Sequence, residues 1–206
     1  MPKKIMLFFT FFFLWASGVF SNEAQDFIVK GNSFVEQKKY EEAIQEYRKA
    51  IKSEPKNAKP LLLAGLASAH LGNFDDAVSD TKKAAELDPS YSAFYHLGMI
   101  YAAAKDAPKA LEAYDRALAL NPDSFTVEYQ KGLVLSSQGE QEKAIESFQK
   151  AAKLNPRLVD VHIALAGAYL KLGDQASALA QAEELRNMKQ ETLAQALEKR
   201  IKEKAI

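Results

Sequence analysis

Small residues and prolines recur along this chain at a nearly constant interval of 33 or 34 residues. The set is clearest at Gly65, Ala77, Ala84 and Pro89. Three further sets keep the same internal spacing: Gly31, Ala43, Ala50 and Pro55; Gly98, Ala110, Ala117 and Pro122; and Gly132, Ala144, Ala151 and Pro156. A period of this length is typical of repeat arrays, in which each unit buries its apolar face by stacking on its neighbours. The sequence therefore predicts a repeat array.

Within each copy, apolar residues follow helical spacing in two successive segments. In the first copy, Tyr40, Ala43 and Tyr47 are three or four residues apart, which places them on one face of a helix. Pro55 ends that segment, because a proline cannot continue a helix and restricts the residue before it. In three copies the first helix is expected to end at a glycine in the left-handed conformation, namely Gly72, Gly139 and Gly173. The sequence therefore predicts paired helices.

The third copy carries the residues that make the pattern specific. They are Leu97, Gly98 and Tyr101 in the first helix and Ala110, Tyr114, Ala117 and Pro122 in the second. These residues resemble the tetratricopeptide repeat (TPR), a two-helix unit. The resemblance implies an all-α fold, a right-handed α-solenoid of antiparallel helix pairs. About five units are expected over residues 24–188, at 24–57, 58–90, 91–124, 125–158 and 159–188, followed by a capping helix at 190–206.

Three of the units depart from the common pattern. The second has Ser68 and Thr81 where the family usually has large residues, so looser packing is expected there. The interval from Gly65 to Gly98 is one residue shorter than the others, which predicts a tighter turn into the third unit. The fifth has Ala166 in the glycine position, and such departures are common in terminal repeats.

The tail after the fifth unit has its own helical pattern. Leu193, Leu197 and Ile201 recur every four residues between charged side chains, which predicts an amphipathic helix. We expect this helix to cover the exposed face of the fifth unit. A partner-binding or coiled-coil role is the alternative, although three apolar residues form a short seam for a coiled coil.

Residues 1–21 differ from the rest of the chain. Two lysines precede an almost wholly apolar run from Ile5 to Phe20, and small residues follow up to Ser21. This order is typical of a secretory signal peptide, and the apolar run is short for a membrane span. We expect cleavage after Ser21, with Gly18 as the second choice; the alternatives are an uncleaved membrane anchor and a buried helix. The sequence thus predicts export to the periplasm of a bacterial envelope.

Charge and composition narrow the classes of partner. The 206 residues include 27 basic and 27 acidic side chains, so no excess of positive charge favours nucleic acid. The chain has no cysteine, which excludes disulfides, thiolate metal sites and a cysteine nucleophile. We expect a protein or peptide partner, and contact with a membrane only through an uncleaved N-terminal segment. The sequence does not indicate an oligomer.

Residues suited to catalysis do not cluster in the sequence. The chain has three histidines, His70, His96 and His162, and they stand in different units. No paired metal-ligand motif, glycine-rich phosphate loop or nucleophile elbow accompanies them. Acidic pairs such as Glu41-Glu42 are explained by the favourable charge at the start of a helix. We therefore expect no enzyme activity, no metal site and no cofactor.

The first helices of TPR units line a concave groove, and the resemblance assigns ten residues of this chain to it. These hypothesised partner-binding residues are Ile28, Asn32, Lys59, Leu62, Leu66, Tyr95, Met99, Tyr129, Leu133 and Ile163. The set is mainly apolar, with two tyrosines and a methionine, which suits an extended or helical peptide segment. The alternative is that these side chains pack laterally and expose little surface.

One well-known group of TPR proteins holds the C-terminus of a chaperone in a carboxylate clamp of lysine, asparagine and arginine side chains. In this chain the clamp positions are occupied by Ile28, Asn32, Leu63, Ser92 and His96. Only Asn32 matches the clamp. The resemblance therefore extends to the fold and not to this ligand, and a co-chaperone role is not expected.

Together these patterns predict a non-catalytic scaffold or adaptor of the bacterial cell envelope that binds a partner protein or peptide in the TPR groove. The alternative is a membrane-anchored structural subunit of an envelope complex. The two differ in the fate of residues 1–21, since a cleaved signal gives the adaptor and an uncleaved anchor gives the subunit.

Overall fold

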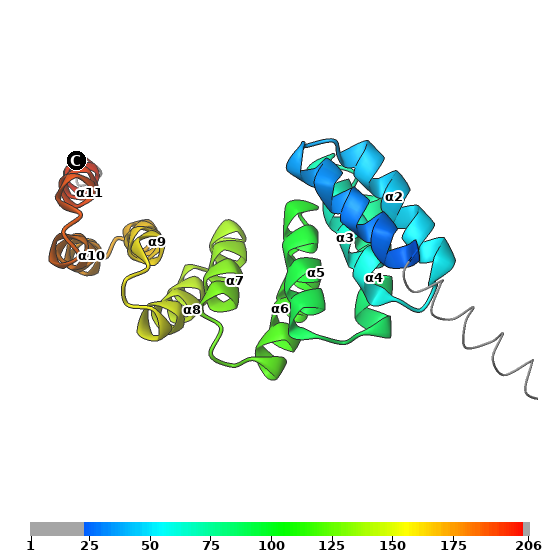
Figure 1. Ribbon diagram of the computed structural model, residues 1–206. Helices are drawn as coiled ribbons and strands as arrows, with labels where there is room; N and C mark the ends of the chain where they lie inside the picture. The colour runs from blue at the N-terminus through cyan, green and yellow to red at the C-terminus, as the bar shows by residue number, and fades with distance from the viewer. Residues whose placement is uncertain (1–22, 204–206) are drawn as a thin grey trace, which may run out of the picture. The chain divides into compact units, whose positions relative to one another are not determined.

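Helices and turns make up the part of the chain that the structure describes. A computed structural model describes residues 23–203, and every regular element in that range is an α-helix (Figure 1). A helix over residues 23–36 is followed by ten more: α2 (Tyr40–Ser53), α3 (Ala58–His70), α4 (Phe74–Leu87), α5 (Tyr91–Ala103), α6 (Ala107–Leu120), α7 (Phe125–Ser137), α8 (Gln141–Leu154), α9 (Val159–Lys171), α10 (Gln175–Asn187) and α11 (Glu191–Glu203). The predicted all-α array of about five TPR-like units with a capping helix is confirmed. The predicted export segment, residues 1–21, lies outside the described residues.

The described residues divide into two compact units, with the boundary between residues 100 and 101. The described part of the first unit holds the helix over 23–36, then α2, α3, α4 and most of α5. There α3 packs against both α2 and α4. The second unit holds the end of α5 and the helices α6 to α11, and each helix from α6 to α11 packs against the next.

Close helix crossings within the pairs depend on glycine. A Cβ atom added to Gly31 would overlap the ring of Tyr47, and one added to Gly132 would lie 2.5 Å from ring carbons of Phe148. Both rings are almost completely buried, so neither can move aside. Interiors packed at this density have no room for an extra methyl group. The predicted role of the small residues in helix packing is confirmed at these two crossings.

The second pair, α3 and α4, crosses as closely as the others. Thr81 is fully buried, and its hydroxyl oxygen lies where a Cβ on Gly65 would have to be placed. Ser68 is also buried. The expectation of looser packing was therefore wrong at this contact, because the Thr81 hydroxyl lies directly against Gly65.

The turn inside each helix pair contains one residue in the left-handed conformation. Gly72, Gly139 and Gly173 have φ of 78°, 82° and 79°, as predicted. In the first and third pairs the same place is held by Lys38 and Lys105, with φ of 58° and 63°. Only glycine adopts this region without steric cost, so these two lysines are locally strained. The sequence pattern did not indicate them.

A partly buried ion pair joins the first two helix pairs. The Arg48 guanidinium on α2 donates to both carboxylate oxygens of Asp80 on α4, at 2.8 and 2.6 Å. The Asp80 side chain is only 5% exposed, so it depends on this bidentate contact for its hydrogen bonds. The same hydrogen bonds raise the pKa of the Arg48 guanidinium.

Helix α11 covers the end of the fifth unit, as predicted. Ile201 packs in one core cluster with Ala166 of α9 and Ala178 of α10. The buried face differs from the predicted stripe, because Leu193 is 39% exposed and Ala194 is buried instead. Arg186 on α10 holds α11 in place through Glu191 and Glu198.

Substitution of two glycines in the second unit tests the packing requirement. Gly132→Ala should lower the free energy of unfolding by about 1–3 kcal/mol, because the new methyl group overlaps the buried Phe148 ring. Gly167→Ala is the matched control, since no atom lies within 4 Å of its added Cβ. Alanine is the better helix former, so the control should gain about 0.5–1 kcal/mol. Urea denaturation followed by circular dichroism measures both, and equal shifts would contradict the packing argument.

Relief of backbone strain should stabilise the third pair. Lys105→Gly is expected to raise the free energy of unfolding by about 0.5–1 kcal/mol, since glycine has no steric penalty at positive φ. The converse substitution Gly139→Lys should lower it by a similar amount. Thermal unfolding of the two variants, compared with the parent chain, measures both effects. A destabilised Lys105→Gly variant would show that the lysine side chain matters more than its backbone.

Candidate functional site

Charge is distributed unevenly between the two helices of a pair in the first unit. The second helices α2 and α4 each carry six charged side chains. Helix α3 carries one, Lys59, and α5 carries no lysine, arginine, aspartate or glutamate. A surface without charge loses little solvation free energy when a partner covers it. The first helices are therefore the better contact surface for an apolar partner.

Most predicted groove residues of the first unit are accessible. Lys59 is exposed, and Leu62, Leu66 and Tyr95 are half-buried. Met99 on α5 is 38% exposed. The ring of Tyr95 stacks on Tyr91 with 6.0 Å between centroids and 4° between planes, and burial raises the pKa of its hydroxyl, with a further contribution from Tyr91. This stacking holds the Tyr95 ring in a defined orientation on α5.

Two predicted groove residues on the helix over 23–36 have structural contacts instead. Ile28 is only 1% exposed and belongs to the core, so its assignment to the groove was wrong. Its neighbour Val29 is 57% exposed. Asn32 is exposed, but its Oδ1 atom accepts a hydrogen bond of 2.8 Å from the Tyr47 hydroxyl. The family register misplaced Ile28, because on this helix its side chain lies in the core while that of Val29 faces solvent.

The second unit contains the three remaining predicted residues. Tyr129 on α7 is half-buried and tilted against Phe148, at 5.9 Å between ring centroids. Burial raises the pKa of the Tyr129 hydroxyl, and the charge of Asp160 adds to the shift. Leu133 on α7 and Ile163 on α9 are each 38% exposed. These two helices touch each other, so the second unit has an accessible apolar strip of its own.

A pocket of about 270 Å³ opens in the first unit where α3, α4 and α5 meet. Its apolar walls are formed by Ala58, Leu62, Ala84 and Ala93. Its polar rim is formed by Lys59, Asp88, Ser90 and Ser92. Lys59 and Leu62 were predicted as groove residues, whereas the others were missed. The signal that could have found them is the short interval between Gly65 and Gly98, which affects the same turn.

Comparison with known proteins identifies the repeat. One family profile, described as TPR repeat, matches residues 31–72, and two described as tetratricopeptide repeat match residues 58–91 and 97–188. The chain belongs to the tetratricopeptide repeat family. Small glutamine-rich tetratricopeptide repeat-containing protein 2 of Saccharomyces cerevisiae is 39% identical over 107 residues, which are 50% of this chain and 30% of that protein.

Two further comparisons show how far the likeness of this TPR protein extends. Hsp70-Hsp90 organizing protein 1 of Glycine max is 36% identical over 96 residues, 46% of this chain and 17% of that protein. The chain thus spans less than a third of the length of either of these relatives. The crystal structure of MamA has a TM-score of 0.73 and 29% identity, covering 79% of this chain and 96% of MamA.

The histidines of this TPR protein are all engaged in packing contacts. His70 stacks on Tyr40 with 4.7 Å between ring centroids, and the ring nitrogens of His162 lie 2.9 Å from Gln181 and 3.2 Å from the Pro156 carbonyl. Burial lowers the pKa of His96. Between residues 23 and 203, no three histidine or carboxylate side chains gather as metal ligands would. No helix in that range is long and apolar enough to cross a bilayer.

The correction at Ile28 leads to a direct test. Ile28→Ala should lower the free energy of unfolding by about 2–5 kcal/mol, because it removes a fully buried side chain. The neighbouring control Val29→Ala should change it by less than about 0.5 kcal/mol, because most of that side chain already contacts water. Urea denaturation of both variants measures the difference. Equal stabilities would restore Ile28 to the list of surface residues.

Proposed function

We propose that this TPR scaffold has no catalytic activity and binds a segment of a partner protein on the apolar faces of its first helices. One observation carries the proposal: α5 has no charged side chain, and yet Tyr95 and Met99 remain accessible on it. A surface of this composition is stabilised by burial against apolar groups, and it gives a charged ligand little to bind.

The tyrosines suit the recognition of a peptide. A tyrosine side chain buries a large apolar ring and keeps a hydroxyl for hydrogen bonding, and few rotatable bonds are immobilised when it is covered. Tyr95 is already oriented by stacking on Tyr91, and Tyr129 by contact with Phe148. Pre-oriented side chains lose less entropy on binding. These residues are therefore the best candidates for the main energetic contacts.

The names of the relatives support a protein partner but not a particular one. Hsp70-Hsp90 organizing protein 1 is named for two chaperones, and its likeness to this chain favours binding of protein partners here as well. The clamp that the TPR resemblance would require for a chaperone C-terminus is not matched, because Leu63, Ser92 and His96 replace its amide and cationic residues. We therefore propose an apolar segment as the ligand.

We further propose that the scaffold works outside the cytoplasm, in the envelope of a bacterium. The support is the order of a basic start, an apolar run and small residues within residues 1–21. If the segment is retained as an anchor, the protein is a membrane-attached subunit of an envelope complex. Sequencing the N-terminus of the protein purified from its cells, together with cell fractionation, distinguishes the two. A cytoplasmic protein that starts at Met1 would contradict both.

The binding surface can be tested by a double substitution. Tyr95→Ala with Tyr129→Ala should reduce capture of the partner by at least about tenfold in a crosslinking pull-down from the native cells, because each unit loses the tyrosine of its own apolar strip. Leu120→Ala with Leu154→Ala is the control, since these leucines are 53% and 39% exposed at the ends of second helices. Circular dichroism checks that both variants stay helical. Unchanged capture by the tyrosine variant, or equal loss in the control, would refute the assigned surface.

A further inference from the structure

The connection between α4 and α5 differs from the three other connections that contain a proline. It contains three residues, Asp88, Pro89 and Ser90, whereas the α2–α3, α6–α7 and α8–α9 connections contain four. In those longer connections the last residue donates its backbone N–H to a carbonyl three positions earlier, as Asn57 does to Glu54. Here the N–H of Ser90 donates to the carbonyl of Asp88, two positions earlier, at 2.8 Å. The tighter turn predicted from the sequence is confirmed.

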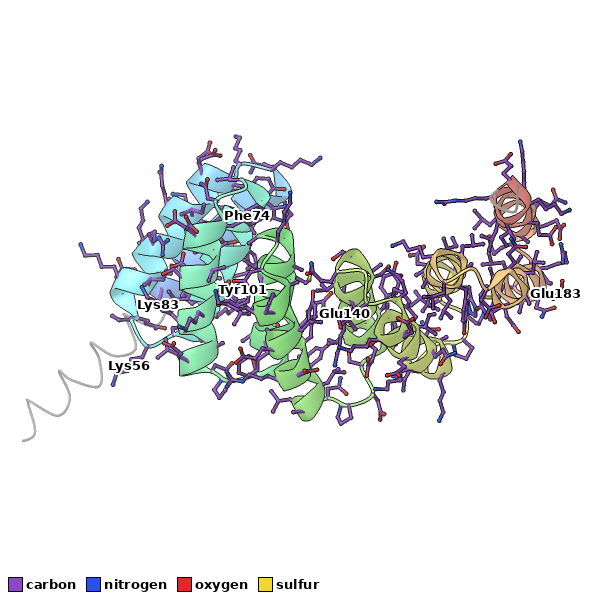
Figure 2. All side chains as sticks on the ribbon, turned by 180° about the vertical axis from the view of Figure 1, so that it is seen from behind. Lys56, Phe74, Lys83, Tyr101, Glu140 and Glu183 are labelled. Atoms are coloured by element: carbon purple, nitrogen blue, oxygen red, sulfur yellow. The ribbon has the colours of Figure 1, made fainter. Side chains whose placement is uncertain are left out.

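The residue missing from this connection is the one after the proline. Lys56, Asp123 and Arg157 occupy that place in the other three connections, and Figure 2 marks the first of them. The pocket of about 270 Å³ lies at the connection that lacks this residue. We infer that shortening the chain at this point removes one charged side chain from the edge of this pocket. The same shortening brings Asp88 and Ser90 to its rim.

The lining of the pocket selects for a mixed ligand. Three alanines and Leu62 form walls of methyl groups, which favour an apolar side chain. Lys59 and Asp88 at the rim carry opposite charges, and neither forms an ion pair with another side chain in residues 23–203. Each charge is therefore available to a ligand. A ligand that places an acidic group at one side and a basic group at the other would satisfy both.

We propose that this pocket receives one apolar side chain of the partner segment, flanked by an acidic residue that meets Lys59 and a basic residue that meets Asp88. The inference rests on the proposed function, because Leu62 belongs both to the pocket wall and to the apolar face of α3. The two rim charges give the bound segment a direction, since the reversed segment would place like charges together. The pocket thus sets the register and polarity of the partner on the scaffold.

The rest of this chain does not supply such a segment at its N-terminus. Residues 1–22 contain two lysines and no acidic residue, so they have no group to pair with Lys59. A free polar metabolite is also a poor match, because most of the wall offers methyl groups and no buried hydrogen-bonding partner. The chemistry favours a segment of another protein.

Synthetic peptides test the assignment on the full chain. The probe is a blocked seven-residue peptide with a central leucine between a glutamate and a lysine; the comparison peptides exchange the two charges or replace the leucine with serine. Titrations followed by the backbone amide signals of Ala58, Ser92 and Ala93 should show the serine peptide binding about three- to tenfold more weakly than the probe. The two charge orders of the leucine peptide should differ in affinity by about the same factor. Equal binding of all three peptides would overturn the proposal.

Charge exchange on the protein separates recognition from a structural role. The double variant Lys59→Glu with Asp88→Lys should invert the preferred order of charges in the peptide, an effect that altered stability cannot produce. Lys56→Glu, at the α2–α3 connection outside the pocket, is the matched control and should leave the preference unchanged. A double variant that keeps the parent preference would overturn the proposal.

Closing the pocket provides a second test. Insertion of one aspartate between Pro89 and Ser90 restores the four-residue connection and should abolish binding of the leucine peptide. Ser92→Trp changes an exposed rim residue and should also abolish binding of the leucine peptide without disturbing the core. This variant replaces the insertion as the test if the insertion unfolds the chain. Retained binding of the leucine peptide by a folded variant would overturn the assignment. Loss of peptide binding that light scattering traces to self-association of the variant would overturn it as well. If only these tests fail while the Tyr95 and Tyr129 substitutions still prevent capture, the proposed function stands without the pocket.

Discussion

Contact between a glycine on one helix and a larger side chain on the next is the constraint on which each unit depends. Gly31 and Gly132 leave space that the buried rings of Tyr47 and Phe148 fill. Since the backbone of the glycine is part of the contact, nothing but hydrogen fits in place of a side chain. Short turns then bring the paired helices together, and a left-handed residue such as Gly139 allows the chain to reverse direction. These local requirements repeat, which is why the sequence repeats.

The helix crossings do not constrain the side chains on the outward faces of the helices. The crossing contacts use one side of each helix, so charge can be placed elsewhere, and in the first unit it is concentrated on α2 and α4. Helix α5 is left without charge, and α3 keeps Lys59 alone. The same freedom applies to the connections, where the loss of one residue before Ser90 changes the surface while the crossing of α3 and α4 at Gly65 is retained. Function is therefore best sought in these variable parts.

The crossings and turns could be predicted because they depend on residues close together in the sequence. Gly72 and Gly139 mark helix ends by themselves, and the capping helix follows from its own periodic pattern. Burial of particular side chains was harder to predict. Ile28 was assigned to the surface and is in the core, while Thr81 was expected to pack loosely and is fully buried. The family pattern predicts which side of a helix usually faces the groove. It does not fix the side on which a particular residue such as Ile28 lies in this chain.

Sequence by itself determined that this chain forms about five paired-helix units of the tetratricopeptide repeat, because the spacing of glycine, alanine and proline allows few other arrangements. It also showed the short interval before Gly98. Only the tertiary structure decided what that interval produces, a pocket whose walls come from α3, α4 and α5 and whose rim carries the opposite charges of Lys59 and Asp88. Residues 29 positions apart meet there through the packing of three helices, and such long-range proximity cannot be derived from local spacing alone.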